Sequence, residues 1–111
     1  DTGGIHIAAA ARVKAFCLTG GGHYGRFLPY PKFVSHIYEM PVVINQPMTC
    51  YGCNWQCSYL DNPRSSYPCI SSIEVDDVFD EIDTYMSTQC NFMENLNESG
   101  KTLISKISGI N

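Results

Sequence analysis

The stretch from residue 73 to residue 86 has the clearest helical pattern in the chain. Its apolar residues recur every three or four positions, which places them on one face of a helix: Val75, Val78, Phe79, Ile82, Tyr85 and Met86. Ser71 followed by Glu74 matches a capping box, the usual pattern for the start of a helix. The sequence therefore predicts a main amphipathic helix over about 72–88.

The segment 5–18 fits two patterns. With a period of two, alternate positions from Ile5 to Cys17 form a wholly apolar face, as in a half-buried strand. With a period of 3.6, Ile5, Ala9, Val13 and Phe16 also align, and the run of alanines favours a helix. We expect a strand over 12–18 and leave 5–11 open between the two.

Glycine and proline divide the middle of the chain. Gly20–Gly22 end the first element, and a loop continues to Pro31, where a short helix over 31–40 is expected because proline is favoured at a first helical position. Val42–Ile44 is β-branched and bounded by turn residues, which predicts a short buried strand. Residues 48–72 hold four cysteines among turn-forming residues and are expected to be a loop.

Residues 91–100 are expected to form a turn of helix that closes into a loop at Gly100, and 101–107 alternates as a final strand does. The predicted fold class is α+β, with a small antiparallel sheet packed on the main helix and a short helix. No repeat or linker divides the chain, so we expect one domain over 1–111.

Cysteine content indicates the cellular compartment. The chain has an even number of cysteines, more than a cytosolic protein of this length needs: Cys17, Cys50, Cys53, Cys57, Cys69 and Cys90. We therefore predict a disulfide-stapled, secreted, extracellular domain, with Cys17 bonded to Cys90. A start at Asp1 fits removal of a signal peptide, and Asn97 begins a glycosylation sequon. Zinc binding and redox chemistry are the weaker alternatives, because the spacing and context do not match those motifs.

Charge and hydropathy exclude some classes of partner. The net charge of −4 argues against general nucleic-acid binding, which needs clustered cations. No apolar run reaches the roughly 18 residues that a membrane span needs. Asp76, Asp80 and Asp83 would lie on the outer face of the main helix, where we expect an acidic contact surface for a basic partner.

Catalytic signatures are weak. Residues 20–25 match G-x-G-x-x-G, but prolines follow where a nucleotide site needs a helix, so a flexible surface loop is expected. His23, Arg26, His36 and Glu39 have the chemistry of a general acid, a general base and a phosphate-binding cation. A small secreted hydrolase, such as a ribonuclease, is the alternative function that they support. No cofactor or metal is predicted.

Aromatic residues in the cysteine-rich loop favour recognition instead. Tyr51, Trp55 and Tyr59 combine apolar rings with polar tips, which are favoured at interfaces. We therefore expect a secreted, non-catalytic interaction protein of effector, toxin or ligand type. Its partner would be a protein, such as a receptor on another cell. A structural or storage protein is the third hypothesis, and the oligomeric state stays open.

Overall fold

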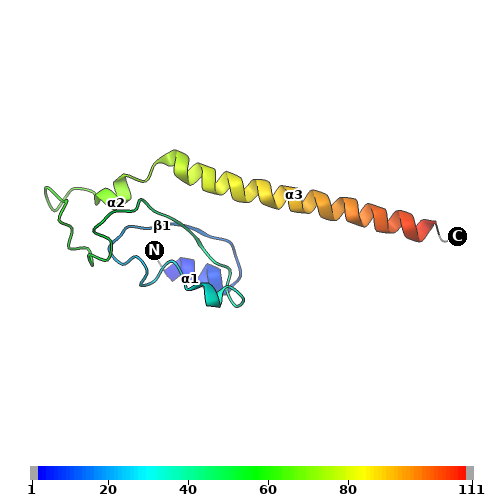
Figure 1. Ribbon diagram of the computed structural model, residues 1–111, viewed down its shortest axis with the longest axis horizontal. Helices are drawn as coiled ribbons and strands as arrows, with labels where there is room; N and C mark the ends of the chain where they lie inside the picture. The colour runs from blue at the N-terminus through cyan, green and yellow to red at the C-terminus, as the bar shows by residue number, and fades with distance from the viewer. Residues whose placement is uncertain (1–2, 110–111) are drawn as a thin grey trace. The chain divides into compact units, whose positions relative to one another are not determined.

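The structure is a computed structural model that describes residues 3–109. It divides into two compact units, Asp1–Phe79 and Asp80–Asn111. The elements, labelled in Figure 1, are the helix α1 (Gly3–Ala10), the strand β1 (Phe16–Leu18), the 3-10 helix η1 (Lys32–Val34), the strand β2 (Val42–Ile44), and the helices α2 (Pro68–Ser71) and α3 (Val75–Ser108).

In the segment 5–18, the helical pattern is correct for the first part and the strand pattern for the last part. Its alanine-rich first half forms α1, and Arg12 ends this helix with a left-handed backbone, at a φ of 57°. The N–H of Val13 donates to the carbonyl of Ala8 at 2.9 Å and the N–H of Arg12 to that of Ala9 at 3.1 Å, the two bonds of a Schellman cap. The strand that we expected over 12–18 is shorter, because the cap uses its first residues.

The sheet is parallel, so the predicted antiparallel pairing is wrong. β1 and β2 pair in the register Phe16 with Val42, Cys17 with Val43 and Leu18 with Ile44. Two strands joined by a tight turn run antiparallel, whereas a parallel pair needs a long connection. The segment 19–41 is such a connection, and it contains η1 in place of the longer helix that we expected over 31–40.

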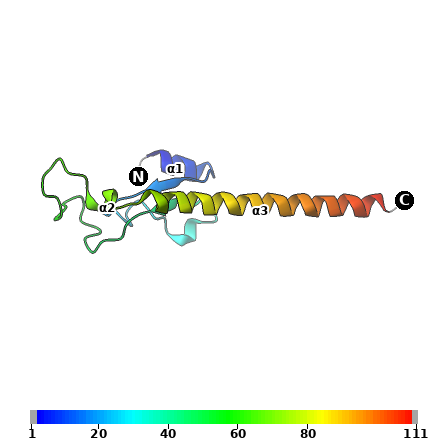
Figure 2. The same ribbon diagram turned by 90° about the horizontal axis from the view of Figure 1, so that it is seen from above.

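The helix α3 is much longer than the predicted 72–88 and includes the predicted loop and final strand. Its 34 residues form one continuous helix in both Figure 1 and Figure 2. The predicted strand 101–107 is helical because Leu103 and Ile107 also continue the helical period of Phe92 and Leu96. Ser71 belongs to α2, so the expected capping box is not formed, and α3 begins directly after Glu74.

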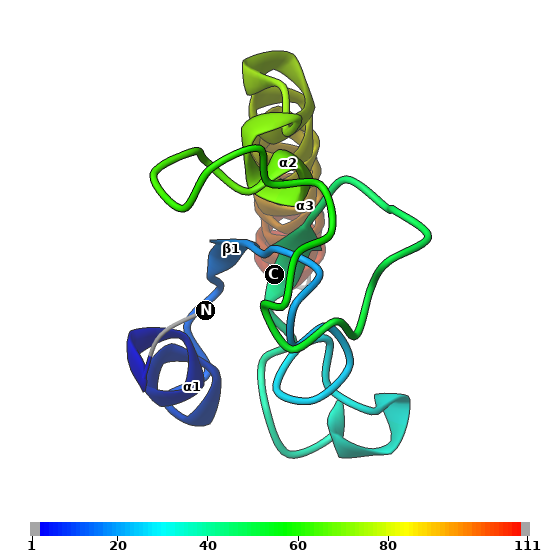
Figure 3. The same ribbon diagram turned by 90° about the vertical axis from the view of Figure 1, so that its left-hand side faces the viewer.

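The buried core of Asp1–Phe79 is small. The apolar residues of the described chain that are buried are Ala9, Cys17, Leu28, Ile44 and Cys69. Leu28 is the largest fully buried side chain among them, at 1% exposure. The loop predicted over 48–72 is confirmed for 48–67, which Figure 3 shows in green as open loops, but its end is wrong because α2 forms there. Loop residues therefore supply part of the packing around the two short strands.

No disulfide links the six cysteines, all of which lie within the described residues. Cys17 and Cys69 are buried thiols, Cys50, Cys53 and Cys57 are half-buried, and Cys90 is exposed. The predicted disulfide staple, including the bond between Cys17 and Cys90, is therefore not present in this structure. Among residues 3–109, no helix has the length and hydropathy required to cross a bilayer.

Candidate functional site

The glycine-rich loop after β1 lies directly against two aromatic rings. A Cβ added to Gly21 would stand 2.1 Å from Cδ1 of Tyr51, and one added to Gly22 would stand 2.4 Å from Cδ2 of Trp55. Both distances are far below a van der Waals contact, so only glycine allows the rings to approach this closely. The three glycines that the sequence places after β1 therefore form a surface on which Tyr51 and Trp55 pack.

Backbone hydrogen bonds join the same two loops. The N–H of Gly52 donates to the carbonyl of Gly21 at 2.8 Å, and the N–H of Asn54 donates to that of Gly22 at 2.9 Å. Asn54 and Trp55 both have left-handed backbones, with φ of 53° and 62°. This conformation is rare for a residue as bulky as tryptophan, and such strain concentrates at functional sites.

A cavity of about 220 Å³ lies beside these loops at the carboxyl end of β1. Its lining combines apolar side chains with aromatic and polar groups, from Leu18, Thr19, Gly20, His23, Tyr24, Leu28, Trp55 and Ile70. Ligands bind preferentially beyond the carboxyl ends of parallel strands, where backbone groups are left without ladder partners. The volume is below the roughly 300–1,000 Å³ of pockets for drug-sized molecules, and suits a single side chain.

Thr19, which lines this cavity, has a side-chain hydroxyl without a partner in the described part of the chain. It is 5% exposed, and its N–H continues the ladder by donating to the carbonyl of Ile44 at 3.0 Å. Its hydroxyl Oγ1 is buried without a hydrogen-bond partner among the described residues. Buried polar groups are nearly always hydrogen-bonded, so a hydroxyl in this state is an exception that needs an explanation.

His23 forms the polar edge of the cavity. Its Nε2 lies 2.7 Å from Oδ1 of Asn54, and with Nε2 protonated this N–H donates to the amide oxygen. The imidazole also meets Trp55 edge-on, with ring centroids 6.0 Å apart, and Trp55 contacts Tyr67 at 4.9 Å. These contacts hold His23 and Trp55 in fixed positions on the cavity wall.

Of the predicted aromatic contacts, two are partly covered and one is exposed. Tyr51 packs on Gly21, with its ring centroid 5.1 Å from that of Tyr24, and its hydroxyl donates to the carbonyl of Gln46 at 2.5 Å. Trp55 packs on Gly22 and lines the cavity. Tyr59 is 51% exposed. Trp55 is thus the member of the set that a ligand in the cavity would touch.

Burial raises the pKa of the Tyr51 hydroxyl above its usual value of 10.0, and the neighbouring thiols of Cys69 and Cys50 and the hydroxyl of Tyr24 raise it further. The folded state therefore binds this proton more tightly than the unfolded state. The resulting stability is complete below pH 10 and is lost as the pH rises through the folded-state pKa. Burial and the neighbouring Tyr38 raise the pKa of Tyr30 in the same direction.

We expect the free energy of unfolding to fall above pH 10, and to fall less steeply in a Tyr30→Phe/Tyr51→Phe variant. Urea titrations between pH 8 and pH 11 measure the slope. Tyr59→Phe, a change at an exposed ring, serves as the control. Equal slopes for the double variant and the unmodified chain would contradict the prediction.

The four residues of the hydrolase alternative are only partly brought together. His23 and Arg26 line one shallow pocket, and the N–H of Arg26 donates to the carbonyl of His23 at 2.9 Å. Glu39 instead forms an ion pair with Lys14, whose ammonium also donates to the carbonyl of Met40 at 3.0 Å. Within residues 3–109, no hydrogen bond or ion pair joins His36 or Glu39 to His23.

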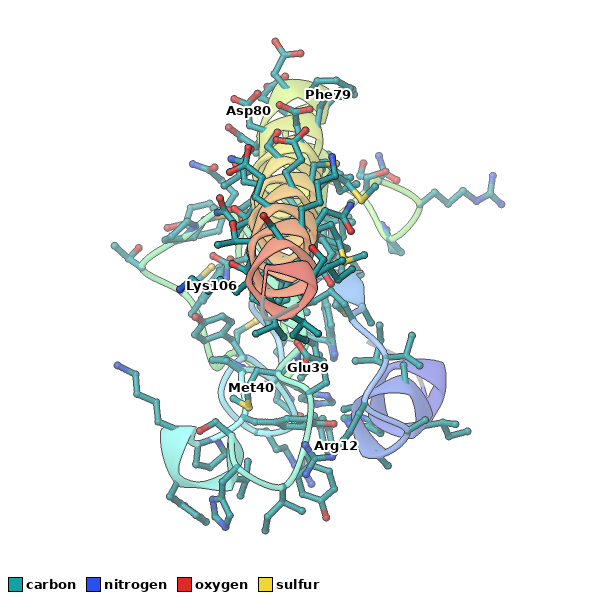
Figure 4. All side chains as sticks on the ribbon, turned by 90° about the vertical axis from the view of Figure 1, so that its right-hand side faces the viewer. Arg12, Glu39, Met40, Phe79, Asp80 and Lys106 are labelled. Carbon is teal, nitrogen blue, oxygen red and sulfur yellow. The ribbon has the colours of Figure 1, made fainter. Side chains whose placement is uncertain are left out.

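The predicted acidic surface lies on the first turns of α3. Asp76, Asp80 and Asp83 are exposed and follow the helical period. Phe79 and Asp80 leave the helix in different directions in Figure 4. Asn97 is exposed but lies in the middle of α3, not in the turn that we expected. Among the described residues, no group of three or more His, Cys, Asp or Glu side chains is placed to hold a metal ion.

Sequence reasoning identified Trp55 and His23, which line the first cavity, but missed Thr19 there and His6 in the second cavity. Thr19 follows a predicted strand, and no pattern in one sequence marks a hydroxyl that will be left without a partner. A second cavity, of about 370 Å³, lies between α1 and the segment around η1, where Nδ1 of His6 is hydrogen-bonded to the hydroxyl of Tyr30. The available signal for His6 was its position opposite the apolar face of the period-two pattern in 5–18.

Comparison of the chain with protein-family models, with curated proteins and with solved structures gave no significant match.

Proposed function

We propose that this chain is a secreted, non-catalytic interaction protein that binds a basic side chain of a partner protein in the Thr19 cavity. The observation that carries the proposal is the buried hydroxyl of Thr19, which has no hydrogen-bond partner within residues 3–109 and belongs to a residue that lines the same cavity as Trp55. A group left unsatisfied in this way costs about 1–3 kcal/mol, and a ligand that bonds to it recovers this free energy.

The lining of the cavity favours an arginine or lysine side chain. Trp55, Tyr24 and His23 supply ring faces and edges, and tryptophan is the best aromatic partner for a cation. The Thr19 hydroxyl oxygen accepts a hydrogen bond from an ammonium or guanidinium N–H. The net charge of −4 would draw a basic partner toward the chain.

The acidic residues of α3 support the same class of partner. Asp76, Asp80 and Asp83 are exposed on a helix whose first half has no basic residue, and surfaces of one sign speed the encounter with oppositely charged partners. Tyr51 and Tyr59, from the predicted contact surface, lie in the same loop as Trp55. A receptor on another cell is one such protein.

Secretion stays a proposal that rests on sequence, namely on the six cysteines and the Asn97 sequon. In an oxidising compartment, the thiols that are free in this structure would pair. Intact-mass measurement of the exported protein, alkylated before and after reduction, shows whether the six cysteines are paired. Alkylation only after reduction would support export into such a compartment, whereas six reactive thiols without reduction would oppose it.

Replacing Thr19 by valine separates binding from stability. Valine has nearly the same shape and removes the unpartnered hydroxyl, so we expect the protein to gain about 1 kcal/mol of stability. Affinity for the basic partner should fall about tenfold, which corresponds to about 1.4 kcal/mol. Urea denaturation and a binding isotherm measure the two effects.

The matched control is Thr88→Val on α3, where the hydroxyl is exposed and donates to the carbonyl of Thr84 at 2.8 Å. This change should leave affinity unchanged. Unchanged affinity in Thr19→Val would remove the cavity from the proposal, and RNA turnover that is lost in His23→Ala would favour the hydrolase alternative.

A further inference from the structure

The helix α3 carries a heptad pattern that the proposed function does not use. One seam consists of positions seven residues apart, namely Phe79, Met86, Met93, Gly100 and Ile107. A second seam, offset by three or four residues, consists of Val75, Ile82, Gln89, Leu96 and Leu103. These are the a and d positions of a coiled coil, and eight of the ten are large and apolar.

The large apolar side chains of this heptad face are exposed. Its eight large apolar side chains are 39–81% exposed, from Ile82 at the low end to Val75 at the high end. An isolated helix gains little stability from its own hydrogen bonds and depends on packing of its apolar face. A face that repeats every 3.5 residues is suited to a second helix with the same repeat.

We propose that α3 pairs with α3 of a second copy of this chain as an antiparallel coiled coil. The distribution of charge sets the direction. Residues 75–91 contain five acidic residues and no basic one, so their net charge is −5, whereas residues 92–108 contain Glu94, Glu98, Lys101 and Lys106, with a net charge of zero. A parallel pair would align the two acidic halves, and an antiparallel pair separates them.

The antiparallel register also matches side chains of complementary size. When Met86 lies opposite Leu96 of the second copy, every a position meets a d position along the whole helix. The other layers are Val75 with Ile107, Phe79 with Leu103, Ile82 with Gly100 and Gln89 with Met93. A parallel pair would instead place Gly100 against Gly100 and leave a gap between the helices.

The same register brings opposite charges together at the edge of the interface. Lys101 of one copy faces the side of the other helix that carries Asp76, Asp80 and Asp83. The acidic residues of α3 would therefore contact both the second copy and the approaching basic partner. The length of α3 is about 51 Å, from its 34 residues at about 1.5 Å each. A seam about 10 Å wide then buries about 1,000 Å² in total, the lower limit for a specific interface.

The first test compares two variants that add the same charges. Met86→Glu/Leu96→Glu places carboxylates in the seam, and we expect the dimer dissociation constant to rise at least about 100-fold. Thr84→Glu/Asn91→Glu places the carboxylates on the opposite, outer face of the helix. This variant should change the dimer dissociation constant by less than about threefold. Sedimentation equilibrium of the full chain measures the constants, and circular dichroism shows whether helix content falls with dissociation.

The second test determines the direction of the helices. Cys90 is exposed and flanks the seam close to its centre, so in the antiparallel pair the two Cys90 thiols lie on the same side and face each other. In protein reduced beforehand, so that every thiol is free as in this structure, a short bis-maleimide should link them, and peptide mass mapping should identify the Cys90–Cys90 product. In a parallel pair the two thiols lie on opposite sides of the seam and are not linked.

A chain that is monomeric at every concentration would overturn the proposal and indicate that the heptad face packs within its own chain. A dimer equally weakened by both double variants would overturn the proposed seam. A dimer without the Cys90–Cys90 product would overturn the antiparallel direction. None of these outcomes depends on the Thr19 cavity, so the two proposals fail separately.

Discussion

Replacing Gly22 by alanine is expected to destabilise the unit Asp1–Phe79 by about 3 kcal/mol, at the upper end of the usual cost of overpacking. The new methyl group would stand 2.4 Å from Cδ2 of the Trp55 indole, and the ring lies on a strained backbone that leaves it little room to move. Urea denaturation followed by circular dichroism measures the loss. The emission of Trp55, the single tryptophan, should also shift as its ring is displaced.

Gly3→Ala is the matched control, because a methyl group added to Gly3 in α1 meets nothing within 4 Å. It should leave stability unchanged or raise it slightly. A double-mutant cycle adds a sharper criterion. In a Trp55→Leu background the clash is relieved, so Gly22→Ala should cost much less there. An equal cost in both backgrounds would show that the ring and the loop are not coupled.

Truncation of Leu28 to alanine is expected to cost 2–5 kcal/mol, about the usual range for a buried leucine. Leu28 is the largest side chain that the structure buries completely, and it also lines the Thr19 cavity. The substitution therefore removes apolar contacts from a very small core and enlarges the cavity. The midpoint of urea denaturation reports the loss, with the m-value checked for a change in the unfolded state.

Ile7→Ala removes the same number of carbon atoms from a side chain that is 72% exposed. It should change stability by less than about 0.5 kcal/mol, as surface substitutions usually do. If Leu28→Ala and Ile7→Ala lowered the free energy of unfolding by similar amounts, Leu28 would not be buried in the folded protein.

The sequence predicted which segments form helices and strands better than it predicted where those elements end or how they pair and pack. The apolar period of 75–86 identified α3, and Val42–Ile44 was correctly expected to be a strand. The region 101–107 was assigned wrongly because Leu103, Ser105 and Ile107 alternate like a strand while Leu103 and Ile107 also fit a helix. Short apolar runs are ambiguous in this way, and here the continuous helix before them decides.

Long-range geometry could not be read from local patterns. The parallel direction of β1 and β2 depends on the path of 19–41, which no residue pattern determines. Trp55 was identified from its chemistry, but its contact with the glycine loop is a tertiary feature. Thr19 was not identified at all, because a missing hydrogen-bond partner is a property of the whole environment of a residue.

The most direct test of the proposed function is a titration of the chain with a capped Gly-Arg-Gly peptide, followed by the fluorescence of Trp55. We expect a saturable change with a dissociation constant of about 1 mM, which corresponds to about 4 kcal/mol. The change should be weaker in Thr19→Val and absent with a capped Gly-Leu-Gly peptide. No saturable change, or an equal response to the leucine peptide, would contradict recognition of a basic side chain in this cavity.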